Sequence, residues 1–220
     1  MVKKLVVAID GPAGAGKSTV SKLAAEKLGY TYIDTGAMYR AVTWKALKQG
    51  EPLTDEKILA VVSNIEIVLR YAGKTTQVLV DGEDVTDQIR TPQISAVVSQ
   101  VARLGLVREK MVDEQRRMAK TGGVIMDGRD IASNVLPNAD VKIFLTASLE
   151  ERAKRRWLEM KKTGCDMTLE EIKADIARRD KEDSEREISP LVQAADAKIL
   201  DTTGMEIAAV VSAIVKRCST

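Results

Sequence analysis

The sequence contains no histidine among its 220 residues. This absence excludes a Ser-His-Asp or Cys-His mechanism and any histidine-ligated metal, because each of these needs an imidazole as base or ligand. Any catalysis must therefore use lysine, arginine, aspartate and a metal ion. Cysteine is also scarce: Cys165 and Cys218 lie far apart, without the spacing of metal ligands. We expect both to be reduced structural thiols.

Long apolar runs and a strong net charge are missing too. No run approaches membrane-spanning length, and the first residues lack the pattern of a signal peptide, so we expect a cytoplasmic protein without membrane contact. The net charge of +2 is too small for a dedicated nucleic-acid binder. The length of 220 residues fits one domain with an inserted subdomain.

A glycine-rich stretch follows the first apolar run. Gly11 to Ser18 matches G-x-x-x-x-G-K-[ST], with a predicted strand before it and a predicted helix after it. Glycines let backbone N–H groups approach phosphate oxygens, and the following helix N-terminus adds positive potential. We expect Lys17 to reach the outer phosphates of a nucleoside triphosphate and the Ser18 hydroxyl to bind Mg²⁺. The residues expected to bind this nucleotide are Gly11, Pro12, Ala13, Gly14, Ala15, Gly16, Lys17, Ser18 and Thr19.

Short apolar runs alternate with helical patterns along most of the chain. This alternation predicts an α/β fold of the P-loop NTPase type, in which helices cover both faces of a five-stranded parallel sheet. The strands are expected near residues 6–10, 30–34, 124–127, 141–145 and 197–201. Because parallel strands end at the same edge, we expect the loops that follow Ile9, Asp34 and Asp127 to lie together there.

Other segments depart from this alternation. Residues 65–69 and 77–80 are β-rich and separated by turns, which predicts a small antiparallel insertion. Capping boxes at Ser148 and Thr168 predict the starts of two helices, and residues 203–206 are expected to cap the last helix.

Arginines gather in one part of the sequence. Six of the fifteen fall within 35 residues, at Arg152, Arg155, Arg156, Arg178, Arg179 and Arg186. Two interpretations remain open: a solvated, salt-bridged pair of helices, because acidic residues are nearly as dense there, or a lid that closes over phosphates.

The remaining chemistry favours a phosphate acceptor. Asp127 ends an apolar strand and is typical of the second acidic motif of P-loop enzymes, which holds Mg²⁺ directly or through water. The base-reading N-K-x-D of GTPases is absent. Without a histidine base, an acceptor that is itself an ionised phosphate needs only positioning and electrostatic stabilisation. The sequence thus favours a nucleoside-monophosphate kinase, with a nucleotide-dependent switch as the alternative.

Seven motifs, in order over essentially the whole chain, resemble those of bacterial cytidylate kinases. The most specific are Asp34-Thr35-Gly36-Ala37-Met38-Tyr39-Arg40 and Asp127-Gly128-Arg129-Asp130. The others lie at residues 10–17, 81–85, 89–91, 140–145 and 178–180. The resemblance implies reversible, Mg²⁺-assisted transfer of the γ-phosphate of ATP to CMP or dCMP. A kinase for another monophosphate, such as UMP, remains the alternative.

The resemblance also implies roles for individual residues. Arg40 and Arg129 would hold the acceptor phosphate, and Asp183 and Arg179 would lie near the sugar. The implied CMP site comprises Thr35, Arg40, Ser99, Arg108, Arg129, Asp130 and Asp183. Within it, the residues that would read the cytosine are Ser99, Arg108 and Asp130.

The implied catalytic and metal residues partly overlap this set. Arg186 would neutralise the moving phosphoryl group together with Lys17, and Arg156 is assigned to ATP. The catalytic group is Lys17, Arg129, Arg179 and Arg186. Ser18 would hold Mg²⁺, and Asp127 would hold it directly or through water.

We expect one domain over residues 1–220, in a monomeric protein. A core (1–35, 106–151 and 187–220) would carry an acceptor-binding insertion at about 36–105 and a helical lid at about 152–186.

Overall fold

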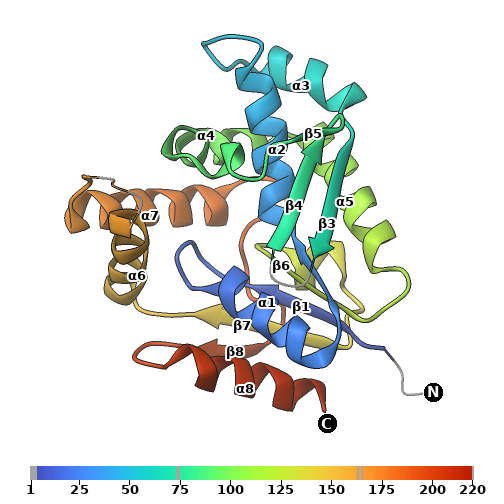
Figure 1. The fold of residues 1–220 in the computed structure, drawn as a ribbon, viewed down its shortest axis with the longest axis vertical. Helices are drawn as coiled ribbons and strands as arrows, with labels where there is room; N and C mark the ends of the chain where they lie inside the picture. Colours follow the sequence, from blue (N-terminus) through green and yellow to red (C-terminus); the bar gives the residue numbers. More distant parts are fainter. Residues whose placement is uncertain (1–3, 73–74, 163, 165, 220) are drawn as a thin grey trace.

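The computed structural model describes residues 4–72, 75–162, 164 and 166–219, so Cys165 lies outside the described residues. Within these ranges, five parallel strands form one sheet in the order β2-β6-β1-β7-β8 (Figure 1). The strands are β1 (Val6–Asp10), β2 (Thr31–Asp34), β6 (Val124–Gly128), β7 (Val141–Thr146) and β8 (Lys198–Asp201). The predicted parallel sheet is confirmed, and β1 lies at its centre.

Helices cover both faces of this sheet. Apolar side chains of α1 (Lys17–Leu28) and α8 (Ile207–Cys218) pack against one face. Those of α5 (Gly105–Ala119) and the short π-helix η2 (Ile131–Val135) pack against the other.

The alternation of side chains along β1 explains this layering. Val7 and Ile9 belong to the core beneath α1 and α8, whereas Ala8 belongs to the core beneath α5. All three are completely buried, so β1 is covered on both faces. The result is the predicted three-layer arrangement.

A second apolar core lies beside the parallel sheet. It is built from α2 (Thr35–Leu47), α3 (Asp55–Asn64) and α4 (Pro92–Ala102), with the 3₁₀-helix η1 (Gln88–Arg90). The antiparallel sheet β3-β4-β5 also contributes to it, through residues of β3 (Ile67–Ala72) and β4 (Thr75–Val80), with β5 (Glu83–Asp84) at the edge.

The small sheet differs in detail from the expectation. Its antiparallel pairing is confirmed, but the sequence prediction did not include β5. Ile65, expected to start a strand, instead ends α3 and is buried.

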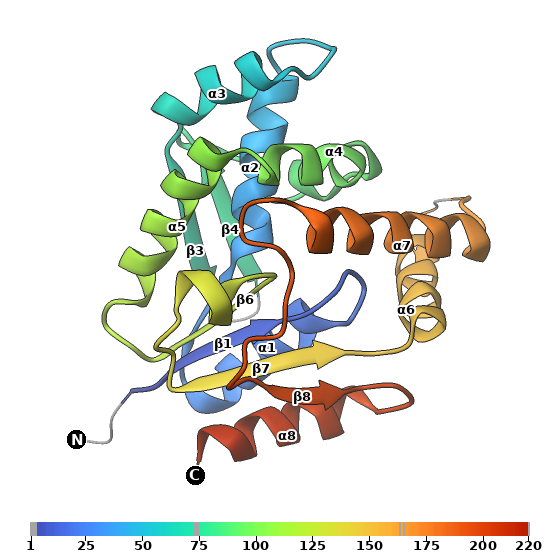
Figure 2. The same ribbon diagram turned by 180° about the vertical axis from the view of Figure 1, so that it is seen from behind.

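Two further helices, α6 (Leu149–Lys162) and α7 (Leu169–Glu185), extend beyond the carboxyl end of β7. Both views show α7 leading from the top of α6 to a position beneath α4 (Figures 1 and 2). No helix in the described ranges has the length and apolar character needed to cross a bilayer.

The helix starts confirm part of the capping prediction. Thr168 forms a complete capping box with Glu171 at the start of α7. Ser148 Oγ accepts from the Glu151 N–H at 3.2 Å, but the reciprocal bond of a capping box is not made: the Ser148 N–H donates to Thr203 Oγ1 at 2.9 Å, and the Glu151 carboxylate accepts from Arg155 Nε at 2.9 Å. The N-cap of α8 is Glu206, within the predicted residues 203–206, and it makes no side-chain capping bond.

Candidate active site

The glycine loop lies at the carboxyl end of the central strand. Gly11 has φ +151°, and a Cβ atom there would lie 1.9 Å from the Leu145 carbonyl oxygen of β7, so only glycine fits. The loop ends at Gly16, whose left-handed backbone leads into α1 at Lys17. The N-terminus of α1 therefore faces the loop, as phosphate binding requires.

Lys17 is held inside this loop. Its Nζ donates to the carbonyl oxygens of Gly11 and Pro12, both at 2.8 Å, and the residue is 6% exposed. Burial lowers the pKa of Lys17, and repulsion from Arg129 lowers it further. The amine is thus placed where an incoming phosphate replaces the carbonyl contacts and stabilises its charge.

A strand-end carboxylate faces the first turn of α1. Asp127 Oδ2 accepts from Ser18 Oγ at 2.9 Å, and its Oδ1 accepts from the Tyr32 hydroxyl at 2.8 Å. Burial raises the pKa of Asp127, and the nearby Asp34 carboxylate raises it as well. A cation bound here would offset the unfavourable burial of the negative charge on Asp127.

This pair fits Mg²⁺. Ser18 and Asp127 offer adjacent oxygen atoms, the donors that Mg²⁺ prefers, and Mg²⁺ usually completes its shell with water and substrate phosphates. Among the described residues, no group of three or more Cys, Asp and Glu side chains forms a metal cage. The residues therefore fit a metal that arrives with a nucleotide.

The other strand ends meet this loop as expected. Asp10 of β1 lies opposite Gly128 of β6, and Asp34 of β2 lies opposite Asp127. Thr35 donates from its hydroxyl to the Asp127 carbonyl oxygen at 2.7 Å. The three predicted loops thus form one rim.

Across from the loop, Arg40 of α2 contacts α4. Its Nη1 donates to Ser95 Oγ at 2.8 Å. Burial lowers the pKa of Arg40 to about 9, and repulsion from Arg179 lowers it further. Ser99, one turn farther along α4, is half-buried. The region around Arg40 is therefore strongly electropositive.

Asp130 lies at the centre of a buried charged cluster. One carboxylate oxygen pairs with Arg108 of α5, and the other lies 3.4 Å from Arg186 Nη2. The side-chain amide of Asn134 also donates to Asp130 Oδ2, at 3.1 Å. The Arg108 guanidinium in turn lies over the Tyr39 ring, 5.6 Å from its centroid.

Asp183 of α7 extends this cluster toward the loop. It accepts from Arg129 Nε at 2.7 Å, and its other oxygen lies 3.9 Å from Arg186 Nη1. These contacts give a continuous series of alternating charges, in the order Arg108, Asp130, Arg186, Asp183 and Arg129.

Arg179 faces the same region. Its buried Nε has no hydrogen-bond partner among the described residues. Burial and the repulsion of Arg129 lower the pKa of Arg179. An anion in this region would supply the missing acceptor.

The arginines of α6 and α7 divide into groups with different surroundings. Arg152 and Arg155 donate to backbone carbonyl oxygens, including those of Ala13 and Thr202. Arg178 is exposed and pairs with neighbouring carboxylates of α7, as the solvated interpretation predicts. Arg156 is partly exposed, with a weak 3.5 Å pair to Glu159.

Sequence reasoning assigned no role to four residues that organise this region. Tyr32 contacts Asp127, and Ser95 contacts Arg40. Asp10 accepts from the N–H groups of Ile131 and Ala132, both at 2.8 Å. Asp34 caps α2 and pairs with Arg90 at 3.1 Å. Only the two aspartates had a signal, since each ends a predicted strand at the functional edge.

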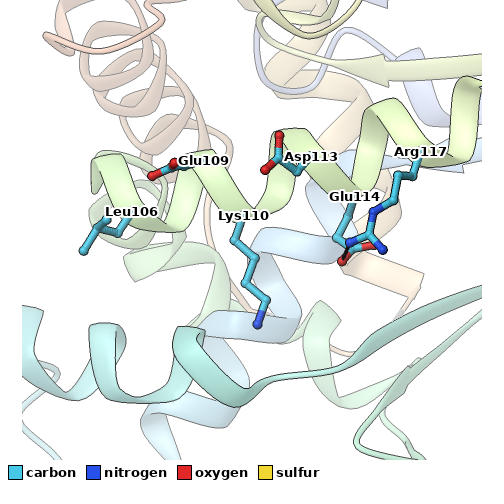
Figure 3. A pocket seen from close by; sticks show the side chains of 6 residues that line it. All are labelled: Leu106, Glu109, Lys110, Asp113, Glu114 and Arg117. Carbon is cyan, nitrogen blue, oxygen red and sulfur yellow. Dashed lines mark hydrogen bonds and ion pairs between the residues drawn. The ribbon is translucent and has the colours of Figure 1, made fainter.

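A surface hollow of about 290 Å³ lies elsewhere, on α5 (Figure 3). Its lining residues are Leu106, Glu109, Lys110, Asp113, Glu114 and Arg117. Lys110 points toward α3 and donates to the Val62 carbonyl oxygen at 2.7 Å, so it links the two helices. None of these residues belongs to the predicted site.

The glycine loop, its lysine and the strand-end carboxylate define a P-loop nucleotide-binding protein, and the facing arginines are those of a phosphotransferase. The family model "Cytidylate kinase" matches residues 7–220. The chain belongs to the cytidylate kinase family.

Named relatives agree with this assignment. A cytidylate kinase of Bacillus velezensis is 56% identical over 217 residues, which cover 98% of this chain and 97% of the relative. One from Bacillus thuringiensis is 53% identical over 215 residues, 97% of this chain and 96% of the relative. The crystal structure of an uncharacterized protein from Eubacterium ventriosum has a TM-score of 0.52 at 15% identity over 97% of each chain, a likeness of fold alone.

Proposed function

We infer that the protein transfers the γ-phosphate of ATP to CMP or dCMP and yields ADP and CDP or dCDP. The observation that carries this inference is the charged series from Arg108 to Arg129. At one end of the series, the buried Arg108–Asp130 pair suits a polar base. At the other end, the Arg129 guanidinium lies near Lys17 of the phosphate-binding loop, so a single nucleotide can contact both ends.

The acceptor base is chosen by hydrogen-bond polarity. Asp130 accepts from the exocyclic amine of cytosine, and Arg108 donates to the ring nitrogen beside it. Uracil presents a carbonyl and an N–H at the same positions. Its acceptor would face Asp130 and its donor would face Arg108, so neither hydrogen bond could form. A buried polar pair left unmatched discriminates strongly.

The acceptor phosphate is held by arginines from three elements. Arg40 comes from α2, Arg129 follows β6, and Arg179 comes from α7. Their mutual repulsion and the unpartnered Nε of Arg179 support binding of a multiply charged group here.

Transfer then needs positioning and charge neutralisation. An acceptor-phosphate oxygen bonds to the γ-phosphorus as the bond from that phosphorus to the bridging oxygen breaks, and ADP leaves with that oxygen. Lys17 and Arg186 stabilise the charge that spreads over the moving group. Ser18 and Asp127 would hold Mg²⁺, which would supply positive charge to offset that of the nucleotide phosphates.

The chain segments divide this work. Residues 36–105 serve as the acceptor-binding part, because they carry Arg40 and Ser99. Residues 152–186 serve as the lid, because α7 contacts the loop at Ala13 through Asp180 and carries Arg179 and Asp183. Closing this lid excludes water, which would otherwise accept the phosphate.

A coupled assay that follows ADP tests the inference. We expect ADP formation to require CMP or dCMP and to be slow with ATP alone. Preference for UMP would support the alternative kinase, and slow hydrolysis unaffected by every monophosphate would support a switch. Either result would contradict the inferred function.

A further inference from the structure

Asp180 takes no part in the proposed transfer, yet its side chain contacts the phosphate-binding loop. We propose that Asp180 and Arg152 are positioning residues, which fix the loop at Ala13 and fix α7 against it. The proposal rests on the inferred function only in taking ATP as the ligand of the loop.

The polar contacts hold both backbone groups of Ala13. Its N–H donates to Asp180 Oδ1 at 2.9 Å, and its carbonyl oxygen accepts from Arg152 Nη1 at 2.8 Å. Arg152 Nη1 also pairs with Asp180 Oδ2 at 2.6 Å. Arg152 is itself anchored by its Nε to the Ala147 carbonyl oxygen at 3.0 Å. Asp180 and Arg152 therefore hold Ala13 between α6 and α7, and we call this set of contacts the clasp.

Apolar packing reinforces this clasp. Ala13 shares a small core with Ala153 of α6 and with Ile172 and Ile176 of α7. A Cβ atom on Gly14 would lie 3.2 Å from the Arg152 carbonyl oxygen and 3.2 Å from Ile176 Cδ1. The loop thus lies directly on the helix pair, which sets its position.

The same contact sets the rotation of α7. Asp180 follows Arg179 directly and precedes Asp183 by about one helical turn. With Asp180 bound to Ala13, Asp183 reaches Arg129 at 2.7 Å. The clasp therefore sets the loop amides and the α7 side chains relative to one another.

Loss of the clasp should weaken ATP binding. In enzymes, displacing positioned groups by about 1 Å costs up to about 100-fold in rate, because aligned contacts depend steeply on geometry. We expect the contacts between the loop N–H groups and the ATP phosphates to depend on geometry in the same way. We expect Asp180→Ala to raise the Kd for Mg-ATP at least about tenfold, measured by calorimetry without an acceptor. The matched control is Glu182→Ala, which removes an exposed α7 carboxylate paired with Arg178 and should leave the Kd within about twofold.

A second variant covers the case in which Asp180→Ala does not fold. Asp180→Asn keeps one oxygen for the Ala13 N–H but loses the charge that pairs with Arg152, so we expect about a threefold rise in Kd. An unchanged Kd for ATP in both folded variants, with only a lower melting temperature, would overturn the proposal.

The kinetic constants separate positioning from a general loss of structure. We expect Asp180→Ala to raise KM for ATP several-fold more than KM for CMP, because Asp180 contacts the ATP loop directly, whereas Arg108 and Asp130 at the base end of the acceptor site pair with each other. An equal rise in both KM values would overturn the proposal. If the wild type binds ATP but does not phosphorylate CMP, the inferred function fails, and the calorimetric comparison still decides the role of Asp180.

Discussion

At the scale of single residues, Lys17 is the charge most closely associated with the phosphates. We expect Lys17→Ala to lower kcat by about 100-fold or more, because the amine acts on charge that develops in the transition state. A coupled assay measures the loss, and circular dichroism checks the fold. Lys27→Ala, on the exposed side of α1, is the control. Turnover near that of the wild type would contradict the role of Lys17.

Asp130 tests base recognition. Asp130→Asn leaves one acceptor oxygen to serve both Arg108 and the cytosine amine and removes the charge that pairs with Arg108, so kcat/KM for CMP should fall at least about tenfold while the Kd for ATP changes little. Asp113→Asn, an exposed carboxylate on α5, controls for the change of charge. Equal losses for both nucleotides would make Asp130 a structural residue instead.

Asp10 carries a pH dependence of stability. Burial raises its pKa from the ordinary 3.8 to about 6, although two backbone N–H groups oppose this shift. Between these values the folded protein keeps a proton that the unfolded chain has released. The free energy of unfolding should therefore fall as pH rises through this window, by on the order of 2–3 kcal/mol relative to Asp10→Asn.

Urea unfolding of both proteins at about pH 4 and about pH 6.5 measures this difference. Groups other than Asp10 contribute equally to both proteins and cancel in the comparison. A difference between wild type and variant that stays constant with pH would show that Asp10 does not titrate in the folded state as described.

The positions of residues were predictable from the sequence where backbone spacing fixes them. The loop from Gly11 to Ser18 is such a case, because one strand and one helix determine its geometry. The arginines of α6 and α7 were not, since a long flexible side chain can reach phosphate, carboxylate or carbonyl from the same helix. Only tertiary packing shows that Arg152 binds a loop carbonyl and that Arg178 stays in solvent.

At the scale of elements, the cap of α7 offers a test of stability apart from chemistry. Thr168→Ala removes the bond to the Glu171 N–H and should cost about 1 kcal/mol, a fall of about 2–4 °C in melting temperature. Kinetic constants well below that temperature should not change. Glu170→Ala, in the same turn but outside the capping box, is the control. A loss no larger than that of the control would contradict the capping role.

Element types were predictable, but their ends depended on distant partners. Ser148 and Thr168 have the same local pattern, yet the Ser148 N–H donates to Thr203, 55 positions away, while the Thr168 N–H donates to Glu171 within the capping box. Likewise, η2 forms one turn of π-helix whose first N–H groups, of Ile131 and Ala132, donate to Asp10 of β1. Contacts between residues more than 100 positions apart are not visible in a local pattern.

At the scale of the whole molecule, the order β2-β6-β1-β7-β8 determines where the chemistry lies. It places β1 between β6 and β7, so the loop after β1 lies beside Asp127 and beneath the helices that follow β7. The alternation of apolar runs predicted the layers and the functional edge. The α7 contacts with α4 and with the loop arise from tertiary packing. The monomeric state and the cytoplasmic location stay predictions.

The inferred function rests on discrimination among acceptors, which a competition measures most directly. The protein would receive γ-labelled ATP with equimolar CMP, dCMP, UMP, AMP and GMP, and the labelled diphosphates would be separated early in the reaction. We predict that labelled CDP and dCDP each exceed labelled UDP, ADP and GDP at least about tenfold, because the product ratios report relative kcat/KM. Predominant labelling of UDP, or release of labelled phosphate alone, would contradict a cytidylate kinase.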